Sequence, residues 1–199
     1  HLFGVERNGL HHWELGGSER YTFTPSPDTR DRPHVHALCS LARRERLACV
    51  SRDDVRRWDY ARHADDGVFL APSGRWLTSH VAATPDDAHL RVIAQVDRRG
   101  NDRHCLLDLD LGTGAWTELA LIHGAPLWLS PDGNEFWERN RAGLRGQTVA
   151  PRRAWYFELA GASVRSPSDL LAVRSDGQRV ITQRGDAGVE VAGIRAFKS

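Results

Sequence analysis

Residues 50–60 read VSRDDVRRWDY and align without a gap on residues 5–15, which read VERNGLHHWEL. Three of the eleven positions are identical, including Trp13 and Trp58. An offset of 45 residues between copies that hold Val, Trp and turn-forming residues is typical of proteins built from repeated strand-based units. We therefore expect the Trp13 and Trp58 segments to be equivalent strands in neighbouring units.

Weaker copies of the same segment follow along the chain. A large apolar residue, an acid and Leu recur at residues 107–109 and 157–159, and residues 192–194 form a degenerate last copy. The spacing between successive copies stays in the range expected for the units of such a repeat. The repeat therefore extends through most of the 199 residues.

Turn-forming residues lie between these copies, each flanked by apolar runs. Because Pro presets φ and Gly accepts a positive φ, such residues indicate hairpin turns. The three expected turns are residues 71–74, 130–133 and 174–177, and a charged turn at 42–45 takes their place in the first complete unit. The strands expected around the three turns are 68–70 with 76–78, 127–129 with 135–137, and 170–173 with 179–182.

These features predict an all-β fold of four-stranded antiparallel blades, without a substantial helix. The expected blade parts are residues 1–24, 33–66, 67–121, 122–163 and 164–199. The third part is longer than the others, and we expect an insertion there, with strands 90–96 and 104–109 forming a hairpin around residues 98–101.

The pattern resembles the WD40-like β-propeller family and its looser TolB-type relatives. In that family a His, a Ser or Thr, a turn Asp and the repeat Trp form a buried hydrogen-bonded tetrad. The resemblance therefore implies a structural tetrad from His34 or His36 together with Ser51, Asp53 and Trp58. A buried polar network of this kind fixes the register of the strands around it.

The ends of the chain leave two arrangements open. The first unit lacks an inner strand and the last lacks an outer one, and an unpaired strand edge invites aggregation. One arrangement is the C-terminal part of a larger, seven-bladed ring in a longer bacterial protein. The other is a five-bladed ring that the two ends of this chain close together.

Composition narrows the classes of partner. The 27 Lys and Arg nearly balance the 26 Asp and Glu, which argues against a nucleic-acid binder that depends on a basic surface. The sequence contains no apolar run of about 18 residues, so no membrane span is predicted. Three cysteines, at 39, 49 and 105, form neither a disulfide framework nor a zinc motif, so we expect small core residues in a reducing, cytoplasmic compartment.

The His and Asp residues of the sequence do not form a pattern that predicts a catalytic site. His34 and His36 would share one face of a strand, but no third ligand is marked, so we predict neither a metal nor a cofactor. Asp108 and Asp110 would also share a face, and a structural role is the simpler interpretation.

The residues proposed for interaction combine Trp with Arg, two types enriched in binding hot spots. Trp137 would be exposed beside Arg139 and Arg141, and Arg98 and Arg99 lie at the tip of the expected insertion. The leading hypothesis is a non-catalytic platform that binds a protein or peptide. The alternatives are a propeller-type hydrolase or lyase, an accessory domain that gates a catalytic one, and a sugar-binding lectin; fold alone does not decide among them.

Overall fold

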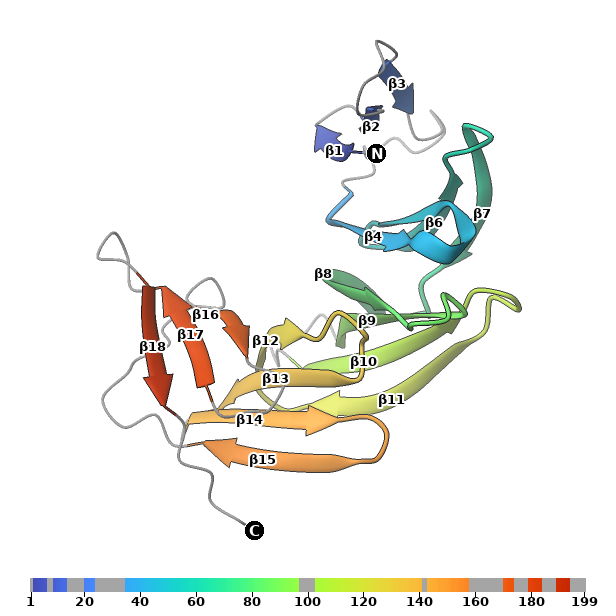
Figure 1. Ribbon diagram of the computed structural model, residues 1–199. Coiled ribbons are helices and arrows are strands. Elements are labelled where there is room, and N and C mark those ends of the chain that lie inside the picture. Colours follow the sequence, from blue (N-terminus) through green and yellow to red (C-terminus); the bar gives the residue numbers. More distant parts are fainter. Residues whose placement is uncertain are drawn as a thin grey trace.

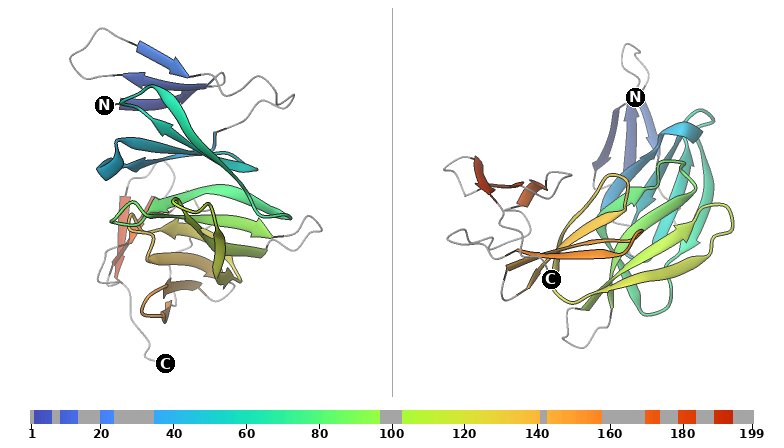
Figure 2. Two further views of the ribbon diagram at one scale, coloured as in Figure 1. Left: turned by 90° about the vertical axis from the view of Figure 1, so that its right-hand side faces the viewer. Right: turned by 60° about the horizontal axis from the view of Figure 1, so that its bottom comes forward.

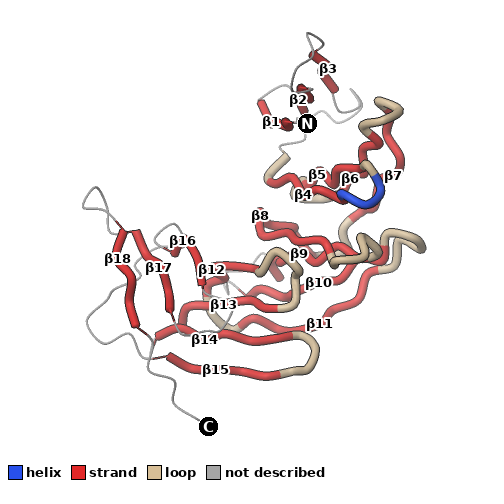
Figure 3. The backbone as a smooth tube through the Cα atoms, in the orientation of Figure 1, coloured by secondary structure: helices blue, strands red, loops and turns tan. Residues whose placement is uncertain are grey.

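The computed structural model describes residues 2–6, 9–13, 20–23, 35–96, 103–140, 143–157, 170–173, 179–183 and 189–193. Within these residues, eighteen strands form five separate antiparallel sheets. A single 3₁₀ turn, η1 (Ala42–Arg44), is the one helical element in this part of the chain. Figure 3 shows that strands account for most of the described backbone.

Each sheet is a simple meander in which every strand pairs with its neighbours in sequence. The first sheet has three strands, β1 (Leu2–Glu6), β2 (Gly9–Trp13) and β3 (Arg20–Phe23). The second has β4 (Ala37–Leu41), β5 (Arg46–Val50), β6 (Asp54–Asp59) and β7 (Ala64–Leu70). The third has β8 (Arg75–Ala83), β9 (His89–Val96), β10 (Arg103–Asp110) and β11 (Trp116–Ile122). The fourth has β12 (Ala125–Leu129), β13 (Glu135–Asn140), β14 (Gly143–Thr148) and β15 (Arg153–Phe157), and the fifth has β16 (Leu170–Val173), β17 (Arg179–Gln183) and β18 (Val189–Gly193).

The sheets follow one another around an arc (Figure 1). The first strands of the later sheets, β8, β12 and β16, lie toward the concave side, and β11 and β15 lie toward the outside. Figure 2 shows the same sheets stacked face to face when the molecule is turned. Residues from β4 and β8 approach each other, as do residues from β8 and β12. The inner strands of neighbouring sheets are therefore in contact.

The 45-residue repeat is visible in the strand register. Leu2 pairs with Trp13 in the first sheet, and Leu47 pairs with Trp58 in the second. The register therefore repeats with the offset found in the sequence, and β1–β3 correspond to β5–β7. The prediction that Trp13 and Trp58 occupy equivalent strands of neighbouring sheets is confirmed.

One type of turn recurs where the first two strands of a sheet meet. The hydroxyl of Ser130 donates to Asp132 Oδ1 at 2.5 Å and accepts the N–H of Glu135 at 2.8 Å. The hydroxyl of Thr84 likewise donates to Asp86 Oδ1 at 2.6 Å and accepts the N–H of His89 at 3.0 Å. Residues 84–87 are therefore the third sheet's version of the turn at 130–133.

This equivalence corrects the prediction for residues 71–74, which do not form a hairpin turn. Residues 68–70 belong to β7, which pairs with β6, and residues 76–78 belong to β8, which pairs with β9. The segment between them joins two sheets, so the expected unit boundary before residue 67 falls inside β7. Its Pro and Gly resemble a hairpin turn, but Ala71 stands where the turns at 84–87 and 130–133 have Thr or Ser, and Ser73 stands where they have Asp.

The expected insertion is also reinterpreted. β9 and β10 do pair as an antiparallel hairpin, as predicted. They are the second and third strands of a regular four-stranded sheet, so the third unit contains no extra hairpin. The expected tip at residues 98–101 lies outside the described residues. The hairpins β4–β5, β12–β13 and β16–β17 form where the sequence predicts them.

Apolar side chains fill the spaces between sheets. Between the second and third sheets, the buried cluster includes Leu41, Val55 and Leu90. Between the third and fourth, it includes Ile93, Leu106 and Phe136. Cys49 and Cys105 are buried and all three cysteines are free; burial raises the pKa of the Cys49 thiol to about 12. Burial of apolar surface between successive sheets therefore holds the stack together.

Candidate functional site

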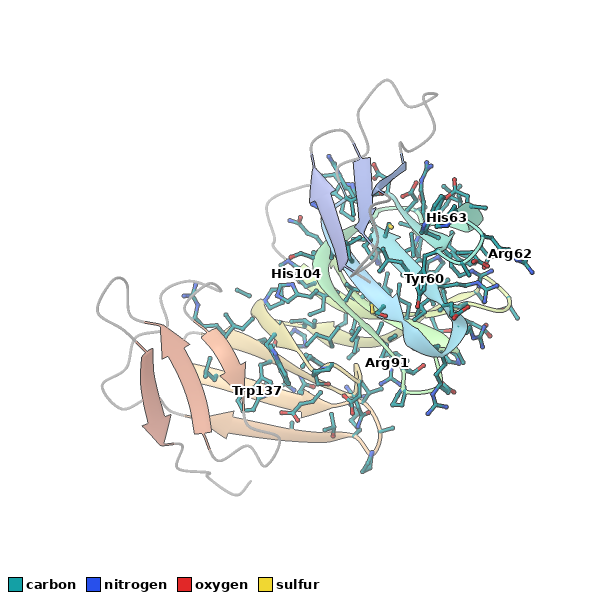
Figure 4. The ribbon with its side chains drawn as sticks, turned by 45° about the horizontal axis from the view of Figure 1, so that its top comes forward. Tyr60, Arg62, His63, Arg91, His104 and Trp137 are labelled. Atoms are coloured by element: carbon teal, nitrogen blue, oxygen red, sulfur yellow. The ribbon has the colours of Figure 1, made fainter. Side chains whose placement is uncertain are left out.

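The space between the third and fourth sheets is apolar in the middle and polar at both ends. Side chains on alternate residues of β10 face the fourth sheet, because strand side chains alternate between faces. Leu106 is buried in the centre with Ile93. His104 lies two residues before it and Asp108 two residues after it, so that each marks one end of the space. Figure 4 shows His104 well apart from Arg91, the cross-strand partner of Asp108.

The end marked by His104 opens into a cavity of about 540 Å³. Residues 78–80, His104 and residues 123–126 line it. It therefore takes its walls from β8, from β10, from the link between β11 and β12, and from β12 itself. We call it the three-histidine pocket, after His80, His104 and His123.

His80 reaches the pocket because β8 leaves its regular ladder at this point. The register with β9 shifts between Leu77 and Val81, so the intervening residues bulge. The hydroxyl of Thr78 stabilises the bulge, since it donates to the Ile93 carbonyl at 2.8 Å and accepts the N–H of His80 at 3.3 Å. A β-bulge of this kind redirects the side chains that it carries.

His123 and Gly124 are held by a buried carboxylate on the next sheet. Glu138 Oε2 accepts the N–H of His123 at 2.7 Å and the N–H of Gly124 at 2.9 Å. Its other oxygen, Oε1, accepts a hydrogen bond from Arg145 at 3.1 Å. Glu138 is 1% exposed, so this buried anion is compensated by a cation and two N–H groups. Glu138 on β13 therefore holds the backbone of the pocket rim in place.

The pocket has polar side chains in its lining but no permanent charge among its described lining residues. Burial holds the pKa of His80 below its usual value and the neighbouring His104 lowers it further, while a hydrogen bond with the Leu127 backbone opposes the shift. His80 is therefore neutral near pH 7, with one ring nitrogen as donor and the other as acceptor. The pocket offers hydrogen-bonding groups of both kinds.

The opposite end is closed by ion pairs. Asp108 Oδ2 lies 2.7 Å from His89 Nδ1, and Asp108 Oδ1 accepts from Arg91 Nε at 3.3 Å. The stem of Arg91 packs under the turn at Gly133, where an added Cβ would lie 2.9 Å from Arg91 Cδ. We call His89, Arg91 and Asp108 the ion-pair cluster. Asp108 has the structural role that the sequence favours for it.

Comparison with known proteins places the fold. No family model and no curated protein matches the chain. Among solved structures, it is similar to an oligogalacturonate lyase in complex with manganese, at 12% identity and a TM-score of 0.56 over 76% of this chain and 46% of that one. It is also similar to TolB from Acinetobacter baumannii, at 15% identity and a TM-score of 0.50 over 94% of this chain and 46% of that one. The fold is a β-propeller.

A third similar structure is a mitotic checkpoint complex, at 18% identity and a TM-score of 0.46 over 90% of this chain and 56% of that one. The chain thus spans about half the length of these solved structures. The predicted β-propeller fold is confirmed, and TolB is among the solved propellers that the chain resembles.

The propeller places the predicted tetrad residues in several surroundings. Ser51 is buried, and its hydroxyl donates to Asp54 Oδ1 at 2.5 Å. Asp53 is exposed, with 78% of its side chain accessible, so the carboxylate that Ser51 contacts is that of Asp54. Trp58 is buried with Leu47, and the His36 side chain is exposed. His34 lies outside the described residues, and a role for Trp58 in a polar network stays a prediction.

The structure describes two of the five residues predicted to bind a partner, Trp137 and Arg139. Trp137 is 1% exposed, so the hypothesis that it anchors a partner is wrong. Its ring lies over Gly146, directly opposite in the register, where an added Cβ would come within 2.8 Å of the ring. Arg139 is partly buried, and Arg98, Arg99 and Arg141 lie outside the described residues. Absence of a side chain at Gly146 lets the indole lie flat against the sheet, which the sequence around Trp137 does not reveal.

Two features are absent from the described residues. They contain no group of three or more His, Cys, Asp or Glu placed to hold a metal ion. No helix in this part of the chain combines the length and the apolar character needed to cross a bilayer.

Proposed function

We propose that this propeller is a non-catalytic recognition platform for a protein or peptide, and that one side chain of the partner enters the three-histidine pocket. Solved propellers of similar fold include a lyase and TolB, so the fold leaves the function open and the site must decide it. The observation that supports the proposal is the cavity of about 540 Å³, whose walls come from the third and fourth sheets and the link between them.

The size and lining of the pocket suit one side chain with its hydrogen-bonding groups. Small-ligand sites have volumes of roughly 300–1,000 Å³ and contain a few convergent polar groups. Here the polar groups come from three separate elements, and apolar residues lie directly beneath them. A partner that placed a side chain between the two sheets would gain both hydrogen bonds and an orientation.

Blocking the pocket tests the proposal. A peptide-display library is selected on the full chain, and the affinity of the selected peptides is measured for Ser79→Trp, which places a bulky ring at an exposed position of the lining. Ser73→Trp is the matched control, because Ser73 is also exposed and lies in the link between two sheets, outside the pocket.

We expect Ser79→Trp to lose at least about tenfold in affinity, or about 1.4 kcal/mol, because the cavity is occupied. Ser73→Trp should bind as the unaltered chain does, and both variants should unfold at the same urea concentration as the unaltered chain. Peptides that bind Ser79→Trp with full affinity would show that recognition takes place elsewhere on the propeller.

A further inference from the structure

The outer strand of the second sheet, β7, exposes apolar side chains at an open edge. Among the described strands, only β6 pairs with β7, so the other side of its backbone has no strand beside it. Val68 is 49% exposed and Leu70 is 74% exposed. Edge strands are usually protected by charged side chains or Pro, so apolar side chains at an open edge indicate a surface where another chain binds.

The backbone groups of Val68 and Leu70 point away from β6. The N–H of Ala71 donates to the Asp53 carbonyl at 2.9 Å, and these two residues continue the register of β6 and β7. Residues that hydrogen-bond across an antiparallel pair alternate with residues that do not. The backbone of Phe69 therefore faces β6, whereas Val68 and Leu70 direct their N–H and C=O groups toward the open edge.

Side chains of the protein already occupy part of this edge. Trp116 packs against the core between the second and third sheets, and its indole N–H donates to the Leu70 carbonyl at 2.9 Å. Arg57, which also bonds to the third sheet, donates to the Asp66 carbonyl at 2.8 Å. The groups that remain for a partner are the N–H and C=O of Val68 and the N–H of Leu70.

The exposed face of the edge carries an acid beside its apolar residues. Val68, Leu70 and the exposed Asp65 lie opposite alternate residues of β6, so their side chains share one face. On the same face, Arg56 Nε lies 3.3 Å from Asp54 Oδ2. Because these two charges balance each other, Asp65 gives the face a net negative charge.

We infer that an extended peptide binds along β7 as a fifth strand of the second sheet, with apolar residues over Val68 and Leu70 and a Lys or Arg beside Asp65. This inference goes beyond the proposed function, because none of these residues lines the three-histidine pocket. In strand addition, backbone hydrogen bonds give affinity and alternate side chains give specificity. An antiparallel partner, the slightly more stable arrangement, would read apolar–x–apolar–x–basic.

A peptide suits this edge better than a second copy of the chain does. Figure 1 shows β7 as the outermost strand of its sheet, on the convex side of the arc. Two convex rims that met along a strand of seven residues would bury little surface beyond it, whereas a stable interface buries roughly 1,200–2,000 Å². β7 itself contains no Lys or Arg that a second copy could place beside Asp65.

The experiment uses one peptide and two N-methylated versions of it. Acetyl-Thr-Val-Thr-Val-Thr-Lys-Thr-amide is titrated into the full chain labelled with ¹⁵N-valine, and Val68→Ile identifies the Val68 amide signal. A methyl group on the nitrogen of the second valine blocks the N–H that would donate to the Val68 carbonyl. The matched control carries the methyl group on the threonine between the two valines, whose N–H would point away from β7.

We expect the peptide to shift the Val68 amide signal. Methylation of the second valine should weaken binding at least about tenfold, and methylation of the control threonine less than about twofold. Val68→Lys should also lose at least about tenfold, while Thr117→Lys, at an exposed position of β11, should bind as the unaltered chain does. Asp65→Asn should weaken binding by about threefold, and only for the peptide that contains Lys.

Equal affinities of the two methylated peptides, or full affinity in Val68→Lys, would overturn the inference. So would a titration in which the Val68 signal does not move. Sedimentation tests the second copy: a dimer that Val68→Lys dissociates would show that β7 pairs with itself, and the peptide would be the wrong occupant.

The pocket variant separates this inference from the proposed function. Ser79→Trp should bind the Thr-Val peptide with unchanged affinity, because Ser79 lines the pocket and lies outside β7. Failure of the strand-addition experiment would leave the pocket proposal standing if Ser79→Trp still weakened binding of the library-selected peptides. Loss of the Thr-Val peptide in Ser79→Trp would place its binding at the pocket and contradict the assignment to β7.

Discussion

The two ends of the space between the third and fourth sheets contain similar residue types in different arrangements. At one end, Asp108 pairs with His89 and Arg91, and the turn at Gly133 covers the arginine. At the other end, His80 and His104 face a cavity, and Glu138 accepts hydrogen bonds from the backbone of the rim. One end is closed by charges that neutralise each other, and the other stays open.

The two ends satisfy their buried polar groups in different ways. A buried polar group costs free energy unless it is paired, and the ion-pair cluster meets that requirement within the chain. The three-histidine pocket meets it by keeping His80 neutral. The ion-pair cluster therefore satisfies its charges within the third sheet, whereas the pocket keeps hydrogen-bonding groups available for a ligand.

The largest expected effect on stability is at the ion-pair cluster. Asp108→Asn removes the charge that balances Arg91, whose side chain is only 17% exposed, and should lower the free energy of unfolding by about 2 kcal/mol. Urea unfolding measures the loss. Asp53→Asn is the control, because the Asp53 side chain is 78% exposed and should change stability by less than about 0.5 kcal/mol. If the two variants lost equal free energy of unfolding, the ion pairs of Asp108 would contribute no more to stability than an exposed surface charge.

A smaller loss is expected where the turn covers Arg91. Gly133 has a φ of 69°, and a Cβ there would meet the arginine stem, so Gly133→Ala should cost about 1–2 kcal/mol. Gly74→Ala is matched to it, because Gly74 has a φ of 73° and nothing lies within 4 Å of its added Cβ. The difference in urea midpoint between the two variants isolates the contact with Arg91. Identical midpoints would mean that the turn does not press on the arginine.

The smallest effect should appear in the pH dependence of the open end. The pKa of His80 is lowered in the folded chain. At a pH below the usual pKa of histidine, the unfolded chain therefore binds more protons than the folded chain. The His80 contribution to stability is therefore present above the unfolded pKa and is lost as pH falls through the lowered pKa of the folded chain. Urea unfolding at pH 7.5 and 5.5 should show a smaller pH effect in His80→Gln than in the unaltered chain. An unchanged pH effect would show that His80 titrates as it does in water.

The sequence predicts the repeat of sheets well, because equivalent strands carry equivalent residues. Trp13 and Trp58 share a register position, and the Pro-Asp pattern at 130–133 closes a hairpin as expected. The error at residues 71–74 has a physical cause: this link between sheets carries Pro and Gly at the same positions as the hairpin turn at 130–133. The hydroxyl and Asp at 84–87, where Asp87 takes a positive φ of 55°, distinguish the true turn.

The pocket could not be predicted in the same way. His80, His104 and His123 are far apart in the chain, and no spacing relates them. They converge because β8 bulges and because Glu138 holds the link at residues 123–124. The one signal in the sequence is a His just after the apolar strand at 76–78. The burial of Trp137 could not be predicted for a related reason. The space for its ring exists because the residue opposite on the next strand, Gly146, has no side chain.

The affinity of one library-selected peptide, measured side by side for His104→Gln and Asp108→Asn, tests the central distinction most directly. We predict that His104→Gln loses at least about fivefold in affinity, because it alters the lining of the open end. Asp108→Asn should keep its affinity at a urea concentration where it is still folded. Full affinity in His104→Gln together with lost affinity in folded Asp108→Asn would place recognition at the ion-pair cluster and contradict the account.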